Sequence, residues 1–198
     1  ITATTAMLAL IGPVARDYLK PDASPTTAMS AREQSFGDYR ALVINYPLGK
    51  LPCYYLVTPA EDALGTWVHF LESGVTPVGM EAFETVRVSL GIPEANSELG
   101  VLYNPLEAGL IGSVDFAKGC YIGQEVIARL DSYKKVQKYL VALKFDDNAK
   151  VNAGDSLVQA GQAVGSVTSM SRVPGNGLVG LGYVKTASAI PGTQLELA

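Results

Sequence analysis

Apolar positions follow different patterns in the two halves of the chain. In residues 1–90, short apolar runs alternate with stretches of helical spacing. Ala41–Ile44 and Tyr54–Val57 predict two strands that are joined by a turn at Pro47–Gly49. Strands and helices that follow one another in this order favour an α+β layer.

A helix is expected at Ala60–Glu72, because its apolar residues recur at spacings of three and four. Ser73-Gly74 provides a signal that ends such a helix. The residues at this spacing are Leu64, Trp67, Val68 and Leu71.

From about Val136 onward the helical spacing is lost. Turn residues, as in Asn152–Asp155 and Pro174–Gly177, separate short apolar runs, and this spacing is typical of a small antiparallel barrel or sandwich. The runs are 140–143, 156–158, 163–167, 178–181 and 194–197. We therefore predict an α+β domain over residues 1–135 and a small antiparallel β-barrel over residues 136–198.

Polar chemistry is concentrated in one twelve-residue run, Lys118–Arg129. Two glycines in this run allow a tight turn and a close approach of a ligand to the backbone. The alternating residues Ile111–Phe116 before it predict a strand, and the spacing of apolar residues after it predicts a helix. We expect a strand–loop–helix junction that carries Lys118, Cys120, Tyr121, Gln124, Glu125 and Arg129.

Cys120 is the candidate reactive group of this run. It precedes the expected helix N-terminus and lies close to Lys118, and both features favour the thiolate. Tyr121 offers a ring for stacking, and Glu125 and Arg129 are four residues apart, so they can pair on one helix face. The alternative is a surface turn with a helix salt bridge and a buried thiol.

The charge of the chain gives no electrostatic case for general binding of nucleic acid. The formal net charge is −4, and charged residues make up 17% of the sequence. The sequence contains a local basic patch, Lys134, Lys135 and Lys138. A contact with tRNA is one interpretation of this patch, and a solvated linker is the other.

Cysteine and histidine usage excludes several classes of site. Cys53 and Cys120 are too few for a disulfide framework, which favours a reducing compartment, and we expect a cytoplasmic protein. Cys53 is expected in a sheet or core. With His69 as the single histidine, a metal site and a Ser-His-Asp triad both lack parts, and no apolar run is long enough to span a membrane.

The run Lys118–Arg129 resembles the signature of the YgfZ family, Lys-Gly-Cys-aromatic-x-Gly-Gln-Glu followed by an arginine. Proteins of this family bind folate and are related to the T-protein, the aminomethyltransferase of the glycine cleavage system. The resemblance covers almost the whole chain, with further matches at 9–15, 79–93, 104–110, 165–169 and 181–184. It implies an aminomethyltransferase-like α+β domain followed by a C-terminal barrel. It also implies that this sequence lacks a family-sized N-terminal segment, which in relatives contributes to the folate pocket.

Three departures from the aminomethyltransferase branch favour the YgfZ side. Tyr46–Pro52 holds no acid where that branch places a carboxylate for the pterin. Ala82–Glu84 lacks the arginine of an Ala-Arg-Asp triplet, and Cys120 stands where that branch has no cysteine. The resemblance then implies an accessory protein that uses tetrahydrofolate or a one-carbon derivative. It would support iron–sulfur cluster assembly or repair, with client enzymes or assembly factors that include enzymes of tRNA modification.

The resemblance also implies roles for individual residues. Glu84 or Glu125 would bond the pterin edge, and Lys118 or Arg129 would bind the glutamate tail. Tyr121 would stack on the ligand, and Cys120 would be the catalytic group. The expected cofactor-binding set is completed by Arg87 and Gln124. Two alternatives stay open: a folate-dependent one-carbon transferase, and a non-catalytic scaffold that folate regulates.

Overall fold

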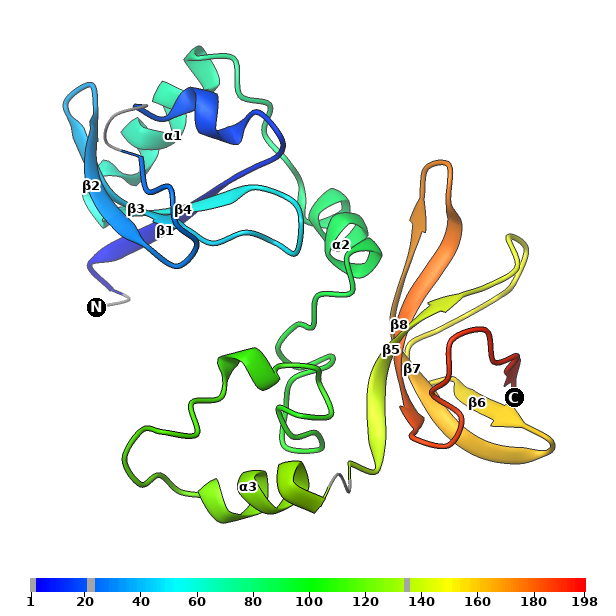
Figure 1. Ribbon diagram of the computed structural model, residues 1–198. Coiled ribbons are helices and arrows are strands. Elements are labelled where there is room, and N and C mark those ends of the chain that lie inside the picture. Colours follow the sequence, from blue (N-terminus) through cyan, green and yellow to red (C-terminus); the bar gives the residue numbers. More distant parts are fainter. Residues whose placement is uncertain (1–2, 21–23, 134–135) are drawn as a thin grey trace. The chain divides into compact units, whose positions relative to one another are not determined.

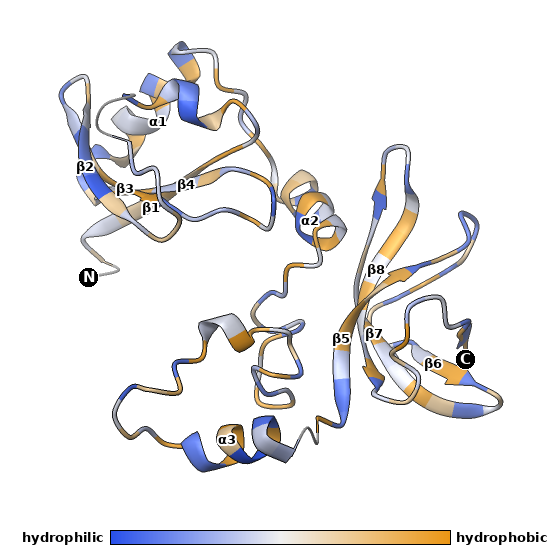
Figure 2. Ribbon diagram, viewed as in Figure 1, coloured by the Kyte–Doolittle hydropathy of each residue, from blue (hydrophilic) through white to orange (hydrophobic). Residues whose placement is uncertain are grey.

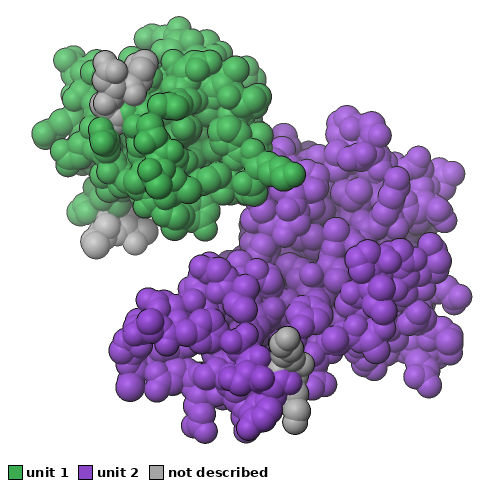
Figure 3. All heavy atoms as spheres, in the orientation of Figure 1, with its two compact units in different colours: residues 1–79 green, residues 80–198 purple. Residues whose placement is uncertain are grey.

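The computed structural model describes residues 3–20, 24–133 and 136–198. The chain forms two compact units, residues 1–79 and residues 80–198 (Figure 3). This division comes earlier than the expected domain boundary at residue 135. The reason is that the helix beginning at Met80 packs against strands of the C-terminal half and therefore belongs to the second unit.

The first unit is built on an antiparallel sheet of four strands in the order β1-β4-β3-β2 (Figure 1). The predicted strands at 41–44 and 54–57 are confirmed, and they pair with one another as parts of β3 and β4. The strands are β1 (Thr5–Ile11), β2 (Ala31–Phe36), β3 (Tyr39–Asn45) and β4 (Cys53–Pro59). Short 3-10 turns occur at η1 (Ala15–Tyr18) and η2 (Ala60–Asp62).

The predicted helix at 60–72 is confirmed as η2 followed by α1 (Ala63–Glu72). The buried residues of α1 are Thr66 and Phe70, whereas Leu64, Trp67, Val68 and Leu71, the apolar residues at helical spacing, are exposed. The helix approaches β3 at Gly65, where a Cβ atom would overlap the ring of Tyr39.

The second unit contains an antiparallel sheet of five strands in the order β5-β8-β7-β6-β9 (Figure 1). The predicted strand runs between residues 140 and 181 are confirmed, but the expected closed barrel is not. Within the described residues, β5 pairs only with β8 and the two-residue β9 only with β6, so the sheet has two edges. The strands are β5 (Lys138–Lys144), β6 (Ser156–Gln159), β7 (Gln162–Val173), β8 (Gly177–Lys185) and β9 (Glu196–Leu197).

Two helices and a 3-10 turn precede this sheet: α2 (Met80–Ser89), η3 (Ile111–Ser113) and α3 (Gln124–Tyr133). The helix expected after the polar run is confirmed as α3. The strand expected at 111–116 is wrong, because this stretch makes local bonds instead of a ladder. The N–H groups of Ser113 and Val114 donate to the carbonyls of Leu110 and Ile111, three residues earlier.

A buried ionic network joins α2 to the sheet. The Arg87 guanidinium donates to both carboxylate oxygens of Glu84 (2.9 and 2.8 Å), to Glu98 (2.9 Å) and to the hydroxyl of Ser169 on β7 (2.9 Å). Glu98 is completely buried and also accepts a 2.6 Å hydrogen bond from Ser169. A buried charge is tolerated only when it is paired and hydrogen-bonded, so this network fixes α2 and the loop at Glu98 against β7.

The same network shifts the ionisation of its members. The hydrogen bond from Arg87 holds the pKa of Glu84 below its usual range, although burial acts in the opposite direction. Burial and the nearby Tyr103 raise the pKa of Tyr183, whose hydroxyl donates to the Glu98 carbonyl (2.9 Å). The rings of Tyr103 and Tyr183 are stacked, with centroids 3.6 Å apart.

Replacing Arg87 by methionine removes the cation from this network. We expect it to lower the free energy of unfolding at pH 7 by about 3–5 kcal/mol, because Glu98 then carries a buried charge with no cation beside it. The difference in unfolding free energy between this variant and the wild type should become smaller as the pH falls through the lowered pKa of Glu84. A carboxylate with a depressed pKa stabilises the folded state above its unfolded value of about 4.3 and loses that contribution on protonation. Urea unfolding across the acid range measures both effects.

The matched control is Arg172→Met, because Arg172 is an exposed arginine of β7 that donates only to the Asp147 carbonyl in the described structure. We expect it to change stability by less than about 0.5 kcal/mol. Equal stabilities for the two variants would contradict the role of Arg87.

Candidate functional site

The polar run of the sequence folds through local hydrogen bonds. A side-chain oxygen of Asp115 accepts the N–H groups of Ala117 (2.8 Å) and Lys118 (3.1 Å). The side-chain oxygen of Gln124 accepts the N–H of Tyr121 (3.2 Å). Gly123 has a φ of +91°, a conformation that side chains disfavour, so glycine is required where the loop enters α3. The loop geometry is therefore set by its own sequence.

This loop and the first two turns of α3 form an open hollow of about 450 Å³. It is lined by Phe116, Lys118, Tyr121, Gln124, Glu125 and Ala128. The ammonium group of Lys118 lies 4.6 Å from the centroid of the Tyr121 ring, in cation–π contact. The hollow thus combines a cation, an aromatic ring, an amide and a carboxylate, which can bind a planar polar ligand that carries negative charge. We call it the α3 hollow.

The two cysteines occupy opposite environments. Cys120 is exposed on the loop, which excludes the buried thiol of the alternative interpretation, although Cys120 does not line the α3 hollow. Cys53 is buried in β4, and burial raises the pKa of its thiol to about 11. Of these two thiols, Cys120 is the one that a solvent-borne reactant can reach.

The structure does not bring all predicted site residues to the hollow. Glu125 and Arg129 lie on α3 as expected, but no ion pair joins them in the described residues. Glu84 and Arg87 belong to the buried network of α2, where protein groups engage the guanidinium. Folate-binding roles for Glu84, Arg87 and Arg129 stay predictions. Phe116 also lines the hollow but was not predicted as a site residue, because the alternating pattern of 111–116 assigned it to the end of an expected strand. Ala128 lies on α3 within the predicted run.

The basic patch is only partly visible, since Lys134 and Lys135 lie outside the described residues. Lys138 begins β5, and its ammonium lies 4.3 Å from the centroid of the Tyr103 ring and donates to the Leu102 carbonyl (3.3 Å). These contacts give Lys138 a structural role. The His69 ring packs 5.8 Å from Phe36 and 5.5 Å from Phe70.

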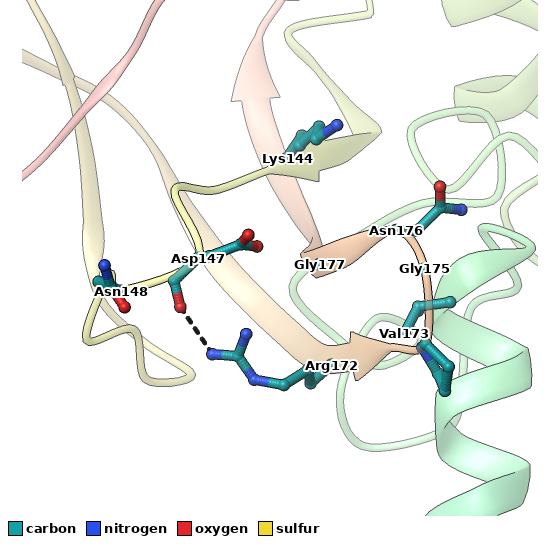
Figure 4. Close-up of a pocket in the computed structure, with 9 residues that line it drawn as sticks. Lys144, Asp147, Asn148, Arg172, Val173, Gly175, Asn176 and Gly177 are labelled. Atoms are coloured by element: carbon teal, nitrogen blue, oxygen red, sulfur yellow. Dashed lines mark hydrogen bonds between the residues drawn. The ribbon is translucent and has the colours of Figure 1, made fainter.

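A second hollow, of about 660 Å³, lies where the turn after β7 meets the loop after β5 (Figure 4). No residue of the expected site lines it. The Arg172 side chain reaches toward the loop and donates to the Asp147 carbonyl (2.8 Å). Its lining residues are Lys144, Asp147, Asn148, Arg172 and 173–177.

The described residues hold neither a metal cluster nor a membrane-spanning helix. Within residues 3–20, 24–133 and 136–198, no group of three or more histidine, cysteine, aspartate or glutamate residues could hold a metal ion. None of the helices in the described ranges is long and apolar enough to cross a membrane.

No protein-family model matches the chain, but it is similar to known proteins. The chain is 31% identical over 202 residues to a putative chloroplastic transferase of Arabidopsis thaliana, covering 100% of this chain and 46% of that protein. It is 30% identical over 213 residues to the aminomethyltransferase of Moorella thermoacetica, covering 100% of this chain and 56% of that protein. The chain spans about half the length of the curated relatives it matches.

The fold of the chain also matches that of a solved aminomethyltransferase structure. The chain superposes on the glycine cleavage system aminomethyltransferase T from Bartonella henselae with a TM-score of 0.81 at 23% identity. The match covers 98% of this chain and 55% of that one. The YgfZ assignment stays a prediction. What these similarities show is that the chain has the fold of the glycine cleavage T-protein, an aminomethyltransferase-like α+β fold.

Proposed function

We propose that the chain binds a reduced folate, tetrahydrofolate or a one-carbon derivative, at the α3 hollow. The observation that carries this proposal is the convergence of Lys118, Tyr121, Gln124 and Glu125 on one hollow of about 450 Å³. This volume lies in the range of small-molecule sites, roughly 300–1,000 Å³. The fold and the aminomethyltransferase relatives support the same class of ligand.

The lining residues fit the chemistry of a folate. Tyr121 and Phe116 offer aromatic surfaces for a flat ring, and the Lys118 ammonium already occupies one face of Tyr121. Gln124 and Glu125 offer an amide and a carboxylate to a hydrogen-bonding ring edge, and Lys118 can pair with a carboxylate tail. A bound reduced folate would supply a carrier for one-carbon units. The protein groups bind it and orient it.

Within this class, we propose an accessory role in the assembly or repair of iron–sulfur enzymes, including enzymes of tRNA modification. Its support is the exposed thiol of Cys120 on the loop that forms the α3 hollow. The lack of an acid in Tyr46–Pro52, the turn between β3 and β4, also separates this chain from the aminomethyltransferase pattern. A cytoplasmic location belongs to the same proposal, although the name of the Arabidopsis relative places that protein in the chloroplast.

The second candidate is a folate-dependent one-carbon transferase. The names of the relatives favour it, since they are aminomethyltransferases and a putative transferase. Such an enzyme would transfer a one-carbon unit between folate and an amine, with the same hollow as the folate site. The two candidates differ in whether Cys120 is needed for client enzymes.

Substitution of Lys118 by methionine tests the folate site. We expect the dissociation constant for 5-formyltetrahydrofolate to rise about tenfold, because an ionic hydrogen bond contributes roughly 1.5–3 kcal/mol. The melting temperature should stay unchanged, since Lys118 is exposed. Isothermal calorimetry of the wild type, of this variant and of the exposed-lysine control Lys150→Met measures the effect. Equal affinities for all three proteins, or no binding by the wild type, would contradict the proposal.

Substitution of Cys120 by serine separates the two candidate functions. The melting temperature should shift by less than about 1 °C because the side chain is exposed, whereas Cys53→Ser places a hydroxyl in a core and should destabilise the fold. The accessory role predicts that Cys120→Ser loses the folate-dependent support of a tRNA-thiolating iron–sulfur enzyme, measured as its turnover. Full support by this variant would remove the thiol from the mechanism and favour the transferase.

A further inference from the structure

The Gln124 side chain is held in one orientation by the loop that precedes α3. Its oxygen accepts the N–H of Tyr121, three residues earlier (3.2 Å). Glutamine or glutamate at this spacing commonly satisfies a backbone N–H at the start of a helix. Because the Tyr121 N–H can only donate, it faces the oxygen of the amide and not its NH₂ group. The NH₂ group of Gln124 is therefore directed away from the loop backbone.

This NH₂ group is available to a ligand in the α3 hollow. Gln124 is one of the residues that line the hollow. Among the described residues, no acceptor is hydrogen-bonded to its amide nitrogen; its side chain bonds only the Tyr121 N–H. The nitrogen of an amide carries two hydrogens and accepts none, so this part of Gln124 can only donate.

Glu125 brings the opposite chemistry to the same hollow. It follows Gln124 in the first turn of α3 and is also a lining residue. In the part of the chain that the structure describes, no ion pair engages its carboxylate. A carboxylate accepts hydrogen bonds through both oxygens and donates none. The hydrophilic start of α3 (Figure 2) thus presents a donor from one residue and two acceptors from the next.

This order of donor and acceptors matches one edge of a pterin ring. Along that edge of tetrahydrofolate, the 4-oxo group accepts, whereas N3–H and the 2-amino group donate. Gln124 can donate to the 4-oxo group, and the two oxygens of Glu125 can accept the other two groups. A 4-amino pteridine places a donor where Gln124 also donates, and its N3 carries no hydrogen for Glu125.

The other groups of the hollow do not distinguish these two rings. Phe116 and Tyr121 offer aromatic surfaces to the face of a ring, which is flat and apolar in both ligands. The Tyr121 hydroxyl can donate or accept. The Lys118 ammonium suits the carboxylate tail, which both ligands share. Discrimination between a 4-oxo and a 4-amino group therefore falls to Gln124.

We propose that Gln124 is the specificity-determining residue of the α3 hollow and selects a 4-oxo pterin over a 4-amino pteridine. This inference rests on the proposed folate site and defines the ring chemistry that the site accepts. The physical cause is an unpaired donor, because a ligand NH₂ group that faces the NH₂ group of Gln124 leaves both without an acceptor. A site built to bond one polar group discriminates against an analogue that lacks it.

Tetrahydrofolate and its 4-amino analogue, tetrahydroaminopterin, test this selection, because they differ only in the group at position 4 and the hydrogen on N3. We expect anaerobic calorimetry to show that residues 1–198 bind tetrahydrofolate at least about tenfold more tightly, the effect of about one lost hydrogen bond. Equal affinities would overturn the selection and leave the folate site in place. Binding of neither ligand would overturn the folate site and the selection together.

The variant Gln124→Glu removes the NH₂ group and keeps the loop. A glutamate still offers an oxygen to the Tyr121 N–H but has no donor for the hollow. The melting temperature should shift by less than about 1 °C, since this residue is exposed. We expect the ratio of the two dissociation constants to fall at least about tenfold, so that tetrahydroaminopterin binds as tightly as tetrahydrofolate or more tightly.

The matched control is Gln162→Glu, because Gln162 is exposed at the start of β7 and does not line the hollow. This variant changes the charge of the chain by the same amount and should keep the wild-type ratio within about twofold. If Gln124 only held the loop, Gln124→Glu would change both affinities by the same factor. An unchanged ratio in Gln124→Glu would therefore overturn the proposal.

Discussion

The contact between Arg87 and Glu98 is the constraint on which the second unit depends. Glu98 is completely buried and Arg87 is 2% exposed, so neither charge can be left without the other. The 2.9 Å hydrogen bond between them, and the hydrogen bond that each side chain makes with Ser169, hold α2 and the following loop against β7. Tyr183 then bonds the Glu98 carbonyl and stacks on Tyr103, where the segment that leads to the α3 hollow begins.

The α3 hollow itself depends on a different kind of interaction. Short-range bonds to Asp115 and Gln124 shape its loop, and no described residue of α3 is buried. The segment that leads to the hollow is packed rigidly where it begins and is shaped by local hydrogen bonds at its loop. Lys118 and Tyr121 are therefore open to a ligand. Binding sites are commonly carried in this way, on loops that a packed scaffold positions.

The sequence predicted what local patterns encode. Strands β3 to β9 and the helices α1 and α3 followed from apolar spacing, whereas β1 and β2 were not predicted. The buried residues of α1, Thr66 and Phe70, did not follow from that spacing. The role of Arg87 could not be predicted from the sequence either, because its partners Glu98 and Ser169 are 71 residues apart in the chain. At the site, the polar residues of the hollow were predicted from one run, but Phe116 was missed because its alternating pattern assigned it to an expected strand.

The most direct test of the folate site is a crystal structure of the chain with 5-formyltetrahydrofolate. The account predicts the pterin ring in van der Waals contact with Tyr121, its polar edge within hydrogen-bond distance of Gln124 or Glu125, and a ligand carboxylate beside the Lys118 ammonium. Ligand density in the hollow between Lys144 and Gly177, with none at the α3 hollow, would contradict it.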